Sequence, residues 1–177
     1  MTKQFPISTG TPINMSPDAR PRLPVRALAQ LMSRRMVLAN LTDQPVSLAQ
    51  FNCLMAEHAP SEMKQACLMH YASEAVCDPL TAFLQHDGSL GLAGASERSP
   101  DFFYLFPDNF AEALPRLDDL VARTINSLAL QLGAHGNPQA PALPLKRRIK
   151  PLPPEDAAWQ WAEAMEALLA QPLAKAG

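Results

Sequence analysis

The sequence predicts a mainly helical domain of the α+β class that carries one small antiparallel β-hairpin. Apolar residues recur at helical spacing in several segments, and one short aromatic run has the composition of a strand. Prolines gather in residues 6–24 and 138–154, so the middle of the chain is left for regular structure. With 177 residues, the chain is long enough for one domain with a real hydrophobic core.

Three helices are predicted in the first half of the chain, at residues 24–40, 47–58 and 61–76. Pro24 suits the first turn of the first helix, where its missing N–H has no partner to lose. Ser47 and Gln50 form a capping box, in which each side chain bonds a backbone N–H at the start of the second helix. Ala59-Pro60 ends that helix because the residue before proline avoids helical geometry, and Ser61 can cap the third.

The hydrophobic period changes after residue 86. Asp87-Gly88 is a turn pair, and the apolar segment 89–94 follows it. The run Asp-Phe-Phe-Tyr-Leu-Phe at 101–106 is short, aromatic and bounded by a proline, which favours a strand. We therefore expect a hairpin at about 89–106, packed on the helices because an isolated hairpin is marginal in water.

The second half contains two further predicted helices. Pro115 to Leu132 carries a clear apolar stripe, and Gly133 stands where a helix commonly ends. The predicted organisation has four parts: a flexible N-terminal arm at 1–20, a helical domain with the hairpin at 21–133, a proline-rich basic linker at 134–154, and a C-terminal amphipathic helix and tail at 155–177.

Charge is unevenly distributed along a chain whose net charge is −2. Between residues 36 and 145, twelve acidic residues stand against four basic ones, so the body is acidic. The basic residues lie at its margins, where they either form a solvated surface or contact nucleic acid or another acidic partner. The candidates for that contact are Arg34, Arg35, Lys146, Arg147, Arg148 and Lys150.

The sequence indicates a cytoplasmic protein. Residues 1–20 lack the apolar run of a signal peptide, and no stretch approaches the roughly 18 apolar residues of a membrane-spanning helix. Three cysteines, without the spacing of a disulfide framework, favour a reducing compartment. The excess of arginine over lysine, together with abundant alanine and leucine, is typical of a bacterial sequence.

Cysteine and histidine crowd into residues 47–86, which raises the question of a metal site. Cys67 and His70 have the ligand types and the helical spacing to share an ion. Cys77 is ten residues beyond Cys67, roughly 15 Å along a helix, so one ion cannot take both thiolates. The alternative is that the cysteines are small buried apolar residues and that the histidines lie at helix–helix contacts.

No motif indicates catalysis, and we expect neither an enzyme nor a cofactor. The acidic body, the methionine-rich helices and the amphipathic C-terminal helix favour a regulatory or adaptor protein that binds another protein. On that helix, the apolar face suited to a partner includes Trp161, Met165 and Leu168. The same face could instead dock in cis or form a homodimer.

The predicted order of three helices followed by a hairpin resembles that of a winged-helix DNA-binding domain. The helix at 61–76 would be the recognition helix, and it offers only Lys64 and Gln65 for bases and phosphates. DNA binding would therefore depend on the basic segments at the margins. DNA binding and a small Cys/His metal-binding protein remain the two alternatives to the adaptor.

Overall fold

The computed structural model describes residues 4–6, 12–14, 23–37, 43–76, 103–108, 110–132 and 148–171. Its helices are α1 (Val25–Arg34), α2 (Leu48–His58), η1 (Ser61–Met63), α3 (Lys64–Met69), α4 (Ala72–Val76), η2 (Phe103–Leu105), α7 (Phe110–Leu132) and α8 (Pro154–Leu169). Its strands are β1 (Gln4–Pro6), β2 (Pro12–Asn14), β3 (Met36–Val37) and β4 (Val46–Ser47). Within these ranges no helix has the length and apolar character needed to cross a membrane.

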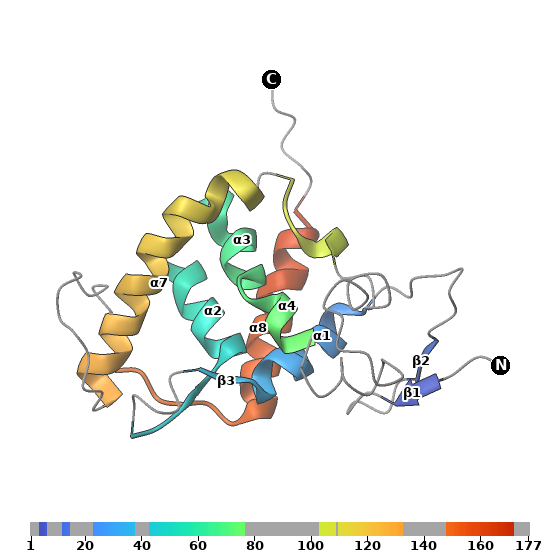
Figure 1. Cartoon of the computed structure of the whole chain (residues 1–177), viewed down its shortest axis with the longest axis horizontal. Helices are drawn as coiled ribbons and strands as arrows, with labels where there is room; N and C mark the ends of the chain where they lie inside the picture. The colour runs from blue at the N-terminus through green and yellow to red at the C-terminus, as the bar shows by residue number, and fades with distance from the viewer. Residues whose placement is uncertain are drawn as a thin grey trace, which may run out of the picture.

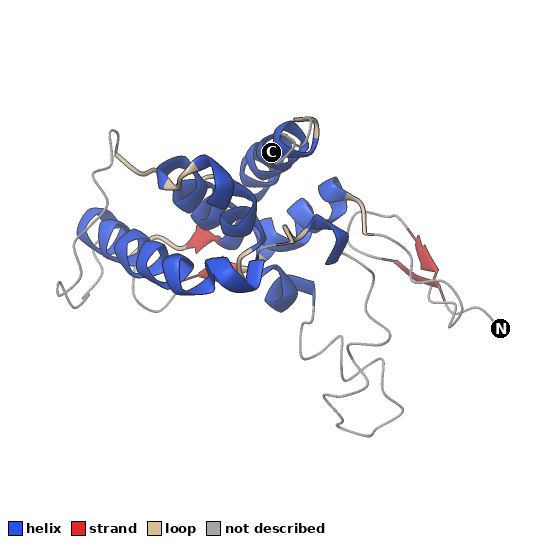
Figure 2. Cartoon of the chain, turned by 90° about the horizontal axis from the view of Figure 1, so that it is seen from above, coloured by secondary structure: helices blue, strands red, loops and turns tan. Residues whose placement is uncertain are grey.

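The predicted fold class, mainly α with a small antiparallel strand pair, is confirmed (Figures 1 and 2). The long helix α7 flanks one side, α2 and α3 lie in the middle, and α8 packs against both α1 and α2. Core residues come from every one of these helices, with Leu28, Met55, Leu68, Leu117 and Trp161 among the fully buried side chains.

The strands lie elsewhere than predicted. β1 pairs with β2 inside the stretch expected to be a flexible arm, and β3 pairs with β4, with Met36 opposite Ser47. The first predicted helix therefore ends at Arg34 and does not reach residue 40. Met36 lies in β3 and is exposed.

The aromatic run at 101–106 is not a strand in its described part, residues 103–106. Phe103–Leu105 form the short helix η2, and residues 89–102 lie outside the described ranges. Tyr104 Oη donates to the Leu23 carbonyl at 2.8 Å, and Gln65 Nε2 donates to the Leu105 carbonyl at 2.9 Å. Leu105 is fully buried and Phe106 packs against the core, so these two residues are buried without a strand partner among the described residues.

The helix predicted over 61–76 is divided into η1, α3 and α4. His70 is extended, with φ −60° and ψ 131°, and Tyr71 has φ 56°. That left-handed conformation costs a residue with a Cβ about 1–2 kcal/mol. The break leaves the Leu68 carbonyl without a further helical turn, and Asn52 Nδ2 and Trp161 Nε1 both donate to it at 2.9 Å. Asn52 Nδ2 also donates to the His70 carbonyl at 2.6 Å.

Two glutamine side chains hold the end of the predicted linker against the body. Gln50 Nε2 donates to the Lys150 carbonyl at 2.7 Å, and its Oε1 accepts from Leu152 N at 2.9 Å, as a neighbouring strand would. Gln131 Oε1 accepts from Ile149 N at 2.6 Å. Ser47 caps α2 by accepting from Gln50 N, as predicted, but the Gln50 side chain serves the linker instead of the capping box.

Helix α8 docks in cis. Trp161 and Met165 are fully buried between α8 and the rest of the body, and α8 contacts α1, α2 and α3. On its surface, Arg26 Nε and Nη2 donate to the two Glu166 carboxylate oxygens at 3.0 and 3.2 Å. The packed indole, more than this exposed ion pair, holds the helix in place.

Candidate functional site

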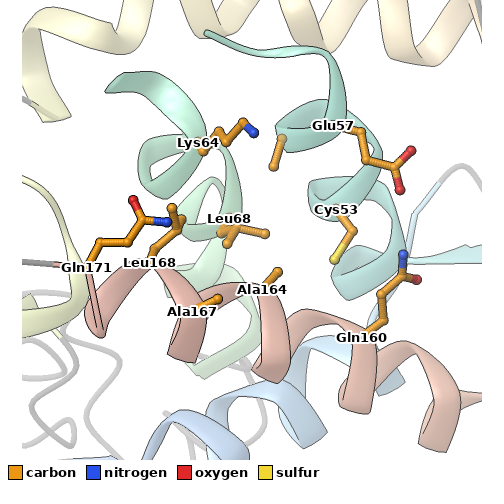
Figure 3. A pocket seen from close by; sticks show the side chains of 10 residues that line it. Cys53, Glu57, Lys64, Leu68, Gln160, Ala164, Ala167, Leu168 and Gln171 are labelled. Atoms are coloured by element: carbon orange, nitrogen blue, oxygen red, sulfur yellow. The ribbon is translucent and has the colours of Figure 1, made fainter. Parts of the chain in front are cut away.

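A groove opens where α2, α3 and α8 meet (Figure 3). Its cavity volume is about 280 Å³. Helix α2 supplies one wall, α3 another, and α8 the third, as Figure 3 shows for the labelled side chains. The lining residues are Cys53, Ala56, Glu57, Lys64, Leu68, Gln160, Ala164, Ala167, Leu168 and Gln171.

Small side chains on α8 create the groove. Ala164 and Ala167 occupy positions where larger residues would fill the space between α8 and the two other helices. Leu68 and Leu168 supply apolar surface beside them, while Glu57 and Lys64 stand at the edge. The result is an apolar floor with a charged rim, the form of a surface that takes an apolar side chain of another molecule.

The exposed surface of α8 beside the groove is acidic. At about 100° per residue, Asp156 and Glu163 lie on the sector next to the one that lines the groove, and Trp159 lies just beyond them. All three residues are exposed, and Trp159 keeps 59% of its surface accessible. Among the described residues, Asp156 and Glu163 make no close ion pair, but Glu163 attracts the Arg26 guanidinium that is paired with Glu166.

The two described cysteines are buried thiols. Burial raises the pKa of the Cys53 thiol to about 12, and the nearby Glu57 carboxylate adds to the shift. Burial raises the pKa of the Cys67 thiol to about 11. Since the thiolate is both the nucleophile and the metal ligand, both groups are held in the less reactive form at neutral pH.

Cys67 and His70 both lie in the core beneath the break between α3 and α4. Burial lowers the pKa of His70, against the opposing effect of the Asp118 carboxylate. Two buried polar atoms there, His70 Nε2 and Asn52 Oδ1, have no hydrogen-bond partner among the residues that the structure describes. Within the described ranges, no group of three His, Cys, Asp or Glu side chains could hold an ion, so the metal site stays a prediction resting on Cys67 and His70.

Two basic segments that are distant in sequence meet near the start of α2. The Arg35 carbonyl accepts from Leu48 N at 2.7 Å, and the Lys150 carbonyl is bonded by Gln50. The backbone of Arg35 and that of Lys150 are thus both bonded to the first turn of α2, and Arg34, Arg35, Arg148 and Lys150 are exposed. Of the predicted basic candidates, Lys146 and Arg147 lie outside the described residues.

The apolar face predicted to bind a partner is divided between two roles. Trp161 and Met165 belong to the core, so neither is exposed to a partner, and Leu168 lines the groove. The groove itself was not predicted from the sequence. Its available signal was the pair Ala164 and Ala167 next to Leu168, small residues beside a large one on a single helical face.

No protein-family model matches this chain, and no curated protein matches it. The function is therefore inferred from these surfaces alone.

Proposed function

We propose that this protein is a non-catalytic regulatory or adaptor protein of the bacterial cytoplasm that acts by binding another protein. The observation that carries the proposal is the groove between α2, α3 and α8, with its apolar floor and charged rim. Protein interfaces have this composition, with an apolar centre that excludes water and a polar border that sets orientation. The protein-binding surface is thus the groove, with Leu168 at its edge.

The chemistry of the groove supports binding over catalysis. Cys53 is the nucleophile type among its lining residues, and burial keeps the pKa of that thiol near 12. A catalytic cysteine needs the opposite shift, produced by a cationic neighbour or a helix N-terminus. The Glu57 carboxylate raises the pKa further.

Site-specific crosslinking in the producing cell tests the proposal. A photoreactive phenylalanine analogue replaces Ala167, which is exposed and lines the groove, or Ala111, which is exposed on α7. We expect one defined protein adduct from position 167 and none from position 111. The same adduct from both positions, or none from position 167, would contradict the proposal. An adduct of two copies of this chain would replace the adaptor by a homodimer.

A second candidate function, nucleic-acid binding, is favoured by one specific observation. Arg34, Arg35, Arg148 and Lys150 come from two segments more than a hundred residues apart, and the fold brings them to one end of the body. The N-terminus of α2, with its partial positive charge, lies at the same end. Phosphate groups are the commonest partner of such a basic cluster.

Salt-dependent binding to duplex DNA separates this second function from the first. A quadruple alanine variant at 34, 35, 148 and 150 should abolish tight binding and lower the slope of log affinity against log salt by about 0.9 for each phosphate that is no longer neutralised. Lys64→Ala, a basic residue in the groove, is the matched control and should leave the slope unchanged. Unchanged binding by the quadruple variant would exclude this end as the surface that binds DNA.

A further inference from the structure

The groove has the size of an anchor site for side chains. Its volume of about 280 Å³ lies at the small end of the range of ligand pockets, roughly 300–1,000 Å³. It also runs along α8, with Gln160 near one end and Gln171, just after the end of α8, near the other. An elongated partner with one or two apolar side chains pointing down fits this form better than a compact ligand.

The rim of the groove carries both signs of charge on the α2 and α3 side, from Glu57 and Lys64, and negative charge on the α8 side. Glu57 projects from α2, and Asp156 and Glu163 project from α8 on the sector next to the lining. Beyond them stands Trp159, an exposed indole whose ring face attracts cations. Lys64 is the one basic residue among the groove's lining residues.

We infer that the occupant of the groove is an amphipathic helix of a partner protein whose apolar stripe is flanked by Lys and Arg. Its apolar residues at i and at i+3 or i+4 enter between α2 and α8 and cover Leu68, Ala164 and Ala167. Its cations meet Asp156, Glu163 and the Trp159 ring on the α8 side of the groove. This inference rests on the proposed function, because it names the chemistry of the partner that binds at the groove.

The test uses three labelled synthetic peptides, each about 15 residues long and helical when bound. The first has leucines on one face flanked by lysine and arginine, the second has glutamate in place of every cation, and the third is a scrambled form of the first. Fluorescence anisotropy of the labelled peptide measures binding to the full chain. We expect the first peptide to bind at least about tenfold more tightly than either of the others.

Two pairs of variants locate the binding. Ala167→Arg places a long cation on the floor of the groove and should weaken binding of the first peptide by about tenfold or more. Ala111→Arg on α7 should leave the affinity unchanged. Glu163→Lys should weaken binding by about two- to fivefold, and more at low salt than at high salt. Glu112→Lys, an exposed carboxylate of α7, is its control.

The outcomes separate this inference from the proposed function. If the acidic peptide binds as tightly as the basic one and Ala167→Arg weakens both, the groove is a protein site but its partner is not basic. Equal binding of the scrambled peptide, or an unchanged affinity with Glu163→Lys, would likewise overturn the inference. If Ala167→Arg affects no peptide and position 167 gives no crosslink, the proposed function fails as well.

Discussion

The two tryptophans of α8 stand two residues apart and have opposite surroundings. Trp161 is fully buried among α1, α2 and α3, and its indole N–H donates to the Leu68 carbonyl. Trp159 keeps 59% of its surface exposed, beside Asp156 and Glu163. The same residue type thus closes the core on one face of the helix and borders the acidic rim of the groove on the other.

The difference teaches why α8 serves two purposes at once. Its inner face must be fixed before its outer face can present a defined surface, since side chains on a loose helix would not hold a groove. Trp161 fixes the inner face by burying a large apolar side chain and by donating one buried hydrogen bond. Trp159 contributes to no described packing of the core, so a stability requirement does not explain a large apolar side chain at that position.

The largest effect is expected from Trp161→Ala. The change leaves a cavity in the core and removes one of the donors to the Leu68 carbonyl, so the free energy of unfolding should fall by about 3–5 kcal/mol. Urea unfolding followed by circular dichroism measures it. Trp159→Ala is the matched control on the same helix. Losses of similar size in the two variants would show that Trp161 and Trp159 contribute equally to stability, against the difference proposed between the two faces of α8.

Where α8 meets the rest of the body, the sequence could predict only the features that depend on neighbouring residues in the chain. Ser47 caps α2 as its spacing indicates, and the amphipathic pattern of residues 155–170 correctly implies a buried face. The pattern does not say what covers that face, because the covering helices, α1 and α2, lie about a hundred residues or more away in sequence. Amphipathicity is thus equally compatible with docking in cis and with binding in trans.

The break after α3 shows a different limit of local prediction. His70 and Tyr71 carry no glycine or proline signal, and Tyr71 nevertheless adopts a positive φ. Tertiary bonds from Asn52 and Trp161 to the Leu68 carbonyl stabilise a conformation that local propensity disfavours. The groove was missed for the same reason, since its walls come from three helices that only the tertiary fold brings together.

The next effect in size tests whether the Leu68 carbonyl is the point that fixes α8. Asn52→Ala removes donors to the Leu68 and His70 carbonyls and should lower the free energy of unfolding by about 1–3 kcal/mol. Hydrogen exchange at the backbone amides of residues 69–72 should also rise. Asn52→Asp is the informative second variant, because a carboxylate has no N–H to donate and should destabilise at least as much.

A wild-type stability retained in Asn52→Ala would mean that the Trp161 indole alone holds the break. In that case, adding Trp161→Phe to Asn52→Ala should produce the fall in the free energy of unfolding that the single variant lacks. Phenylalanine keeps most of the apolar area of the indole but has no N–H to donate. The interaction between the two changes, obtained from the four free energies of unfolding, then measures how far the two donors share one acceptor.

A smaller effect is a dependence on pH from His70. Because burial lowers its pKa in the folded state, the folded protein prefers the neutral ring. Its contribution to stability is therefore present above the ordinary pKa of about 6.5 and is lost as the pH falls below that value. His70→Gln should reduce this loss in urea unfolding measured at about pH 7.5 and about pH 5.5. Asp118→Asn, which removes the opposing carboxylate, should increase it.

The smallest effect on stability is expected from Trp159, and it sharpens the comparison most directly. Trp159→Ala should change the free energy of unfolding by less than about 0.5 kcal/mol, because truncating an exposed side chain outside the core removes little packing. Trp159→Phe and Trp161→Phe leave one indole each, so acrylamide quenching reports on them separately. The indole left in Trp161→Phe should be readily quenched, and the one left in Trp159→Phe should be shielded. A shielded Trp159, or a loss of about 2 kcal/mol in Trp159→Ala, would assign that indole to packing and would remove it from the rim that we propose receives a basic helix.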